Sequence, residues 1–180
     1  MTPSLIIVSG PPGAGKSTLA RELAQRYDPS VLVEGDVFFN FVARGAIDPW
    51  LPESMEQNTV VVRAAATATA VFAAGGFTTL YDGVMGPWFI DEFMQAGGIE
   101  RADYVVLMPS VERCVERVFT RENHGFSDEG GTRKMHLEFA ASEIDPRHVI
   151  ADPPDGVDAV VDLVLDALES GRLAYEPGGS

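Results

Sequence analysis

Residues 10–17 have the types and spacing needed to bind phosphate groups. They fit the pattern G-x-x-x-x-G-K-[ST], between an apolar run at residues 5–8 and a stretch with helical periodicity. Glycines let successive backbone N–H groups point into one concavity, and the following helix adds the N–H donors of its first turn. Lys16 carries a compact positive charge, and Ser17 offers a hard oxygen ligand for Mg²⁺. The pattern therefore predicts a site for a nucleoside triphosphate with Mg²⁺.

A glycine-rich turn that only joins a strand to a helix is the alternative interpretation. Such a turn does not need glycine, lysine and serine at all of the fixed positions, so we favour the phosphate site. The positions expected to contact the nucleotide are Gly10, Pro11, Pro12, Gly13, Ala14, Gly15, Lys16, Ser17 and Thr18.

The composition favours a small-molecule partner over a polynucleotide or a membrane. The 180 residues hold 13 Lys and Arg against 27 Asp and Glu, for a net charge of −14, which repels nucleic-acid phosphates. The single cysteine, Cys114, excludes an internal disulfide framework, and the N-terminus lacks the basic segment of a signal peptide. No apolar run approaches the length of a membrane span. We expect one cytoplasmic domain at 1–174, with a frayed tail at 175–180.

Alternating strand and helix patterns predict an α/β fold. Short apolar runs alternate with amphipathic stretches, and this order is typical of a parallel sheet with helices on both faces. The five expected strands are residues 5–8, 31–33, 77–81, 104–108 and 147–151.

Two aspartates come directly after strands of this sheet. Asp36 follows the second strand and Asp82 ends the third. Because ligands of open parallel sheets bind outside the carboxyl ends of the strands, both carboxylates are expected at the edge that carries the phosphate loop. We assign the role of general base to Asp36 and a magnesium role to Asp82, together with Ser17, although the two aspartates could exchange roles.

Three arginines recur every four residues on one predicted helix. Arg113, Arg117 and Arg121 share a face, where their mutual repulsion favours an anionic partner over a solvated surface. The glycine-bearing loop at about 122–133 follows and ends at Arg133, so we expect a lid that closes over a transferred phosphate.

Aromatic and basic residues are candidates for a second pocket. Trp50 lies between two prolines on a rigid loop, and Trp88 begins a helix. Phe39 belongs to an aromatic run, for which core or lid packing is the favoured alternative to a substrate contact. Arg63 is the only basic residue in a long alanine-rich helix, and it either reaches a substrate or is solvated.

The order of these parts resembles that of the small P-loop kinases. The nearest patterns are those of gluconate kinases, shikimate kinases and chloramphenicol phosphotransferases, and the resemblance spans nearly the whole chain. Residues 45–51 (GAIDPWL) are similar to a gluconate-kinase stretch but lack the Asp-Arg pair before the tryptophan. The glycine trio of shikimate kinases is absent after the third strand, where DGVMG stands at 82–86.

The resemblance implies a three-layer P-loop NTPase fold like that of nucleoside-monophosphate kinases. It implies that Asp36 acts as the base toward an acceptor hydroxyl, and that Arg117 and Arg121 accompany the transferred phosphate. It also implies that the turn at 152–156, which contains Pro153, holds the adenine through backbone contacts.

The expected activity is ATP-dependent transfer of phosphate to a hydroxyl of a small molecule. A sugar acid, a drug-like compound and a nucleoside remain open as acceptors, and the oligomeric state remains open as well. The alternatives are a nucleoside, nucleotide or polynucleotide 5′-hydroxyl kinase, and a regulatory module that binds ATP without catalysis. The expected acceptor contacts are Asp36, Phe39, Trp50, Arg63, Asp82, Trp88 and Arg133.

Overall fold

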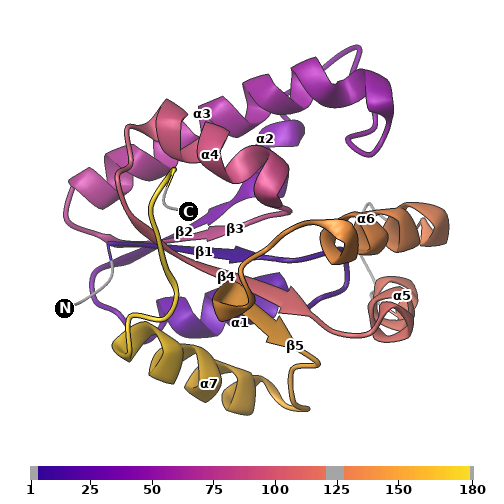
Figure 1. Cartoon of the computed structure of the whole chain (residues 1–180). Helices are drawn as coiled ribbons and strands as arrows, with labels where there is room; N and C mark the ends of the chain where they lie inside the picture. The colour runs from indigo at the N-terminus through magenta and orange to yellow at the C-terminus, as the bar shows by residue number, and fades with distance from the viewer. Residues whose placement is uncertain (1–3, 121–127, 179–180) are drawn as a thin grey trace.

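Five parallel strands form the central sheet, in the spatial order β2-β3-β1-β4-β5 (Figure 1). The computed structural model describes residues 4–120 and 128–178. The prediction of a parallel α/β sheet is therefore confirmed. The strands are β1 (Leu5–Ser9), β2 (Ser30–Glu34), β3 (Thr78–Asp82), β4 (Ala102–Met108) and β5 (Val149–Ala151).

A sixth, antiparallel strand differs from the sequence prediction. The strand β6 (Ala174–Tyr175) pairs with β4, with Tyr175 opposite Ala102. The Tyr175 hydroxyl donates a hydrogen bond to Asp91 at 2.6 Å, and its ring packs edge-on against Tyr104. The expected frayed tail therefore does not begin at Tyr175, because backbone pairing and aromatic packing hold this residue.

The two faces of the sheet are covered by different helix pairs. The helices α3 (Met55–Ala74) and α4 (Pro87–Gly97) pack on one face, and α1 (Lys16–Ala24) and α7 (Val157–Glu169) pack on the other (Figure 1). Side chains of β1 alternate between these two cores, because successive residues of a strand point to opposite faces. The apolar run at residues 5–8 is therefore explained by a parallel strand that is buried on both faces.

Three further helices lie at the carboxyl ends of the parallel strands. They are α2 (Gly35–Phe39), α5 (Val111–Thr120) and α6 (Glu129–Ala141), and two single 3₁₀ turns occupy Pro52–Ser54 and Pro146–His148. The strand arrows in Figure 1 point toward α5 and α6. Residues that follow the strands therefore gather on one side of the molecule.

The aspartate that precedes α6 stabilises the start of this helix. The Asp128 carboxylate accepts a hydrogen bond from the Gly130 N–H at 2.9 Å, which satisfies one of the unpaired donors of the first turn. None of the helices in the described ranges is both long enough and apolar enough to span a bilayer.

A buried hydrogen-bond network fixes the segment that follows β3. The Ser9 hydroxyl, which is fully buried, donates to the Met85 carbonyl at 2.7 Å and accepts from the Met85 N–H at 2.9 Å. The Tyr104 hydroxyl donates to the same carbonyl at 2.6 Å. β1 and β4 are thereby tied to the backbone that follows β3.

Replacing Ser9 by Ala is expected to destabilise the fold by about 1–3 kcal/mol, because the buried Met85 N–H loses its hydrogen-bond acceptor. Urea unfolding followed by circular dichroism measures this change. The matched control is Ser142→Ala, which removes an exposed hydroxyl and should alter the free energy of unfolding by less than about 0.5 kcal/mol. Equal effects of the two substitutions would contradict the role assigned to the network.

Candidate nucleotide and acceptor site

The loop between β1 and α1 is shaped by three glycines with positive φ. The angles are +138° at Gly10, +79° at Gly13 and +101° at Gly15. A Cβ on Gly13 would lie 2.2 Å from the Cys114 carbonyl oxygen, and one on Gly10 would lie 2.3 Å from that of Leu107. The loop therefore packs directly on the backbone of β4 and α5, and only glycine fits at these two positions.

The loop lysine and the serine after it begin α1. Lys16 Nζ donates a hydrogen bond to the Pro11 carbonyl at 3.0 Å, across the loop. Ser17 hydrogen-bonds the Asp82 carboxyl at the end of β3. These residues bring one cation, one hydroxyl and one carboxyl together beside the phosphate loop, as the sequence analysis predicts.

Asp82 is a buried carboxyl with charges of both signs around it. Its exposed fraction is only 6%, and burial raises its pKa above the usual range. The Lys16 charge and the Ser17 hydrogen bond lower the pKa, while the carboxylates of Asp36 and Glu34 raise it further. A divalent cation beside Asp82 would offset the cost of ionising it, so the donor set fits Mg²⁺.

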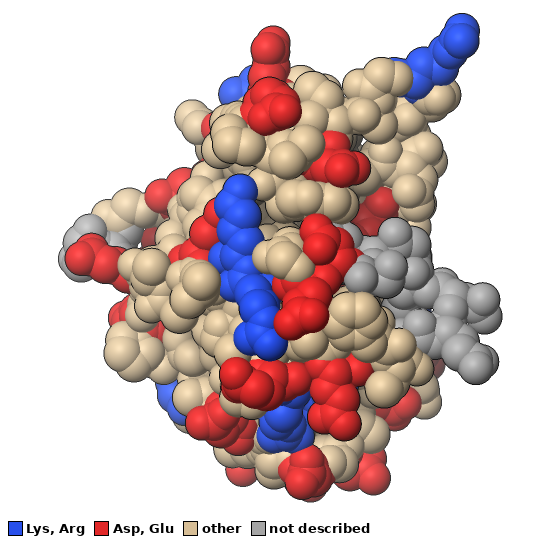
Figure 2. Space-filling view, turned by 90° about the vertical axis from the view of Figure 1, so that its right-hand side faces the viewer, with Lys and Arg blue, Asp and Glu red and all other residues tan. Residues whose placement is uncertain are grey.

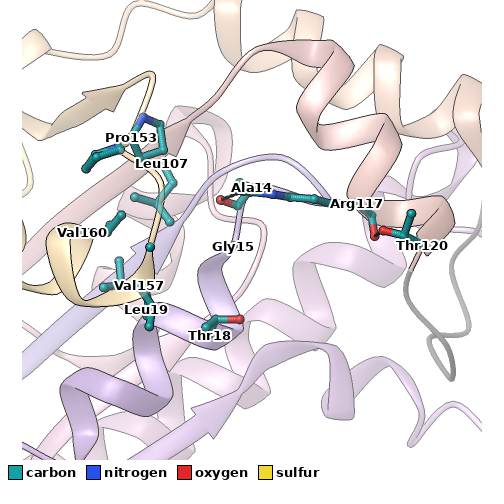
Figure 3. A pocket seen from close by; sticks show the side chains of 12 residues that line it. Ala14, Gly15, Thr18, Leu19, Leu107, Arg117, Thr120, Pro153, Val157 and Val160 are labelled. Atoms are coloured by element: carbon teal, nitrogen blue, oxygen red, sulfur yellow. Dashed lines mark hydrogen bonds between the residues drawn. The ribbon is translucent and has the colours of Figure 1, made fainter.

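A cavity of about 350 Å³ opens on one side of the phosphate loop (Figure 3). Apolar side chains of β4, α1 and α7 form one wall, and the turn with Pro153 closes it. Arg117 enters from α5 on the opposite side, and its Nη1 donates to the Ala14 carbonyl at 3.4 Å. The apolar wall consists of Leu19, Leu107, Val157 and Val160.

Arg113 contacts the turn that closes this cavity. Its guanidinium donates to the Pro153 carbonyl at 3.1 Å and to the Asp155 carboxylate at 2.6 Å. Arg113 is not among the described residues that line the cavity. Arg113 therefore links α5 to the turn at 152–156 and does not line the cavity itself.

A larger cavity, of about 590 Å³, lies on the other side of the loop. Four of the predicted acceptor residues line it together with Lys16 and Ser17. They come from α2, from the loop before α3 and from α4, which the fold brings to one place. These four residues are Asp36, Phe39, Trp50 and Trp88.

Two of the predicted acceptor contacts, Arg63 and Arg133, are not among the described residues that line this cavity. Arg63 forms an ion pair with Glu92, and Arg133 pairs with Glu129 at 2.9 Å. Arg63 reaches from α3 to an acid on α4, whereas Arg133 pairs with an acid one turn earlier on its own helix, α6. Arg121 and most of the predicted lid, at 121–127, lie outside the described residues.

Sequence reasoning missed the part of the cavity that α3 and α6 supply. Asn58, Met135 and Glu138 line it, and Lys134 Nζ donates to the Trp50 carbonyl at 2.7 Å. The alanine-rich pattern of α3 is typical of a helix that packs closely on a sheet, and it does not indicate a cavity wall. A polar Asn58 within the buried stripe of that helix was the available signal.

A protein-family model described as an AAA domain (AAA_33) matches residues 5–142, which is most of the chain. The chain belongs to this AAA-domain family. The match covers the phosphate loop, both aspartates and the helices around the larger cavity. A search of curated proteins finds no match to the chain.

Solved structures of two kinases and of a tunicamycin resistance protein share the fold. A sugar kinase from Janibacter sp. HTCC2649 has a TM-score of 0.69 at 19% identity, over 92% of this chain and 94% of that one. The tunicamycin resistance protein of Deinococcus radiodurans has a TM-score of 0.69 at 14% identity, over 93% and 96%. A gluconokinase from Sinorhizobium meliloti 1021 has a TM-score of 0.61 at 18% identity, over 94% and 93%. The resemblance to P-loop kinases is therefore confirmed at the level of the fold.

Replacing Asp82 by Asn is expected to stabilise the free protein at neutral pH. Burial raises the pKa of this carboxyl in the folded protein, so above that pKa the ionised Asp82 lowers the free energy of unfolding. This cost disappears at a pH low enough for Asp82 to be protonated in both the folded and the unfolded protein. The variant should melt a few degrees above the parent near about pH 8, and the difference should shrink toward about pH 4. Thermal unfolding in the presence of a chelator measures this.

The matched control for this experiment is Asp48→Asn, which removes an exposed charge from a loop. It should leave the free energy of unfolding within about 0.5 kcal/mol of the parent. If Asp82→Asn instead lowers the melting temperature at every pH, the ionised carboxyl is a net stabilising group, and the electrostatics assigned to Asp82 are wrong.

Proposed function

We propose that the protein transfers the γ-phosphate of ATP to a hydroxyl of a small molecule. The observation that carries this proposal is the arrangement of two cavities on either side of one phosphate loop. Ala14 and Gly15 line the smaller cavity, while Gly13, Lys16 and Ser17 line the larger one. A nucleotide whose triphosphate follows the loop would place its nucleobase in the smaller cavity and its γ-phosphate beside an acceptor in the larger cavity.

The smaller cavity suits the base and ribose of a nucleotide. Its apolar wall offers van der Waals contact to a flat ring, and the turn braced by Arg113 supplies backbone groups near Pro153. The phosphates would lie against the loop N–H groups, with Lys16 beside the terminal ones.

Ser17 and Asp82 are the residues that would hold Mg²⁺. In the described part of the chain, no three His, Cys, Asp or Glu side chains cluster as a metal site, so the remaining ligands would be phosphate oxygens and water. The ion, when bound, supplies charge neutralisation to the phosphates.

Asp36 is the proposed general base. It lies in the first turn of α2 and lines the larger cavity with Lys16. The acceptor oxygen would form a bond to the γ-phosphorus while the bond from that phosphorus to the bridging oxygen breaks, and the acceptor proton would pass to Asp36. Arg117, which reaches the loop at Ala14, would stabilise the charge that develops on the leaving side.

The contact between α6 and the loop before α3 lies beside the larger cavity and would restrict access to it. Lys134 donates to the Trp50 carbonyl, and residues of both segments line the cavity. Excluding water matters because an open site would transfer phosphate to water instead of the acceptor.

The surface charge argues against a polynucleotide acceptor. On the face that carries α5 and α6, the described basic side chains stand in narrow groups with acidic side chains beside them (Figure 2). The net charge of −14 adds a general repulsion of nucleic-acid phosphates. A small acceptor that enters the cavity fits these observations better.

Asp36→Asn is expected to lower acceptor-dependent ATP consumption by about 100- to 10,000-fold, because the variant cannot accept the proton of the acceptor hydroxyl. A screen of hydroxyl compounds with Mg²⁺ and ATP, read by coupled ADP release, measures this. ATP affinity, measured by calorimetry, should change little, since Asp36 is not among the described residues that line the smaller cavity.

Asp48→Asn, a change of the same kind on an exposed loop outside the described cavity lining, should retain full activity. If no acceptor raises ATP consumption above the rate without acceptor, and Asp36→Asn equals the parent, phosphotransfer is wrong. A module that only binds ATP would then be the better account.

A further inference from the structure

Tyr81 brings a hydroxyl group to the floor of the larger cavity. It directly precedes Asp82 at the end of β3, and it belongs to the core on the face of the sheet that α3 and α4 cover. Its ring packs against Phe93, with the ring centroids 4.7 Å apart. Tyr81 is only 4% exposed, yet it lines the larger cavity. Most of the ring is therefore part of the core, and only a small part of the side chain can meet a ligand.

Two glycines leave room for the tip of this side chain. A Cβ on Gly35 would lie 2.4 Å from Tyr81 Oη, and one on Gly83 would lie 3.0 Å from the same atom. Both glycines line the larger cavity. Because the ring is packed on Phe93, it could not move aside for a larger residue at either position. The hydroxyl therefore lies between two glycines at the boundary of core and cavity.

The Tyr81 hydroxyl has no hydrogen-bond partner within residues 4–120 and 128–178. Among the buried and half-buried side chains of these ranges, only Asn58 Oδ1 is a polar atom that is both fully enclosed and unpaired. The unpaired Tyr81 hydroxyl is therefore not fully enclosed, and it meets the cavity that its residue lines. A phenylalanine would fill the same core position, so packing alone does not explain the hydroxyl.

The proposed general base lies beside this hydroxyl. The hydroxyl packs against Gly35, which directly precedes Asp36. Burial raises the pKa of Tyr81, and the carboxylates of Asp36 and Asp82 raise it further. The hydroxyl therefore keeps its proton at neutral pH and can donate a hydrogen bond.

An acceptor hydroxyl has one lone pair that the proposed reaction does not use. Its oxygen carries one proton and two lone pairs. In the proposed transfer, the proton passes to Asp36 and one lone pair forms the bond to the γ-phosphorus. The second lone pair can accept a hydrogen bond. A donor beside the base would hold the oxygen with its proton directed to Asp36.

We propose that the Tyr81 hydroxyl donates a hydrogen bond to the acceptor oxygen and thereby orients the acceptor hydroxyl between Asp36 and the γ-phosphate. The inference rests on the proposed phosphotransfer at the same site and adds to it a residue that the sequence analysis does not name as a site residue. Gly35 and Gly83 belong to this arrangement, because a side chain at either position would displace the hydroxyl.

Methanol is a suitable probe, because its single small hydroxyl can enter a cavity of about 590 Å³ without matching the walls. The protein is incubated with Mg²⁺, ATP and excess methanol, and phosphorus NMR separates methyl phosphate from the inorganic phosphate of hydrolysis. Tyr81→Phe keeps the ring and removes only the donor, so it should lower the rate of methyl phosphate formation by about 10- to 100-fold. The melting temperature should stay within about 2 °C of the parent, because the hydroxyl has no partner to lose.

Two further tyrosines provide matched controls. Tyr175→Phe removes a hydroxyl that donates to Asp91, and neither residue is among the described residues that line the cavity, so turnover should be retained. Tyr104→Phe removes a buried hydroxyl that donates to the Met85 carbonyl, so it should lower the melting temperature by a few degrees. If Tyr81→Phe loses stability as Tyr104→Phe does and keeps its turnover, the Tyr81 hydroxyl is structural and the proposal is wrong.

A crystal structure with Mg²⁺, a non-hydrolysable ATP analogue and methanol tests the contact itself. The expected result is a methanol or water oxygen within hydrogen-bond distance of both Tyr81 Oη and the Asp36 carboxylate. A Tyr81 hydroxyl that bonds only Asp36 or another group of the protein would overturn the proposal.

The failure of this proposal can be distinguished from the failure of the phosphotransfer on which it rests. Equal methyl phosphate formation by the parent and by Tyr81→Phe overturns the role of Tyr81 and keeps the phosphotransfer. If the bridging oxygen is present but neither methanol nor any other hydroxyl compound consumes ATP, the contact stands and the phosphotransfer is wrong. Absence of both the bridging oxygen and ATP consumption overturns both.

Discussion

The direct packing of the phosphate loop on the backbone of its neighbours is the constraint on which the site depends. Gly10 and Gly13 leave no room for a side chain against the carbonyls of Leu107 and Cys114. This contact fixes the loop relative to the end of β4 and the start of α5. The same two segments carry Leu107, which is part of the apolar wall of the smaller cavity, and Arg117, so the loop and this side of the cavity are positioned together.

The buried carboxyl of Asp82, beside the loop, lowers the stability of the free protein when it is ionised. Burial raises the pKa of Asp82, yet the magnesium role proposed for this carboxyl needs its ionised form. Lys16 and Ser17 offset part of the cost, and a bound cation would offset more. This arrangement is typical of functional sites, where a group that is unfavourable in the free protein becomes favourable when the ligand binds.

The five parallel strands, the phosphate loop and the positions of the two aspartates could be predicted because each depends on local pattern: apolar runs, fixed glycine spacing, and acids that follow strands. The placement of Arg63 and Arg133 could not, since an arginine pairs with whichever acid the fold brings near it. Asn58 was missed as a cavity residue, because its hydrogen bond to the Pro49 carbonyl depends on the path of the loop before α3. The pairing of Tyr175 with β4 likewise depends on tertiary contact.

The central claim is that one loop joins a nucleotide cavity to an acceptor cavity. A crystal structure with Mg²⁺ and a non-hydrolysable ATP analogue tests it most directly. The account predicts the base against the wall that includes Leu107 and Val160, and the γ-phosphate beside Lys16 facing the cavity that contains Asp36. A γ-phosphate walled off from Asp36, or a base bound in the larger cavity, would contradict it.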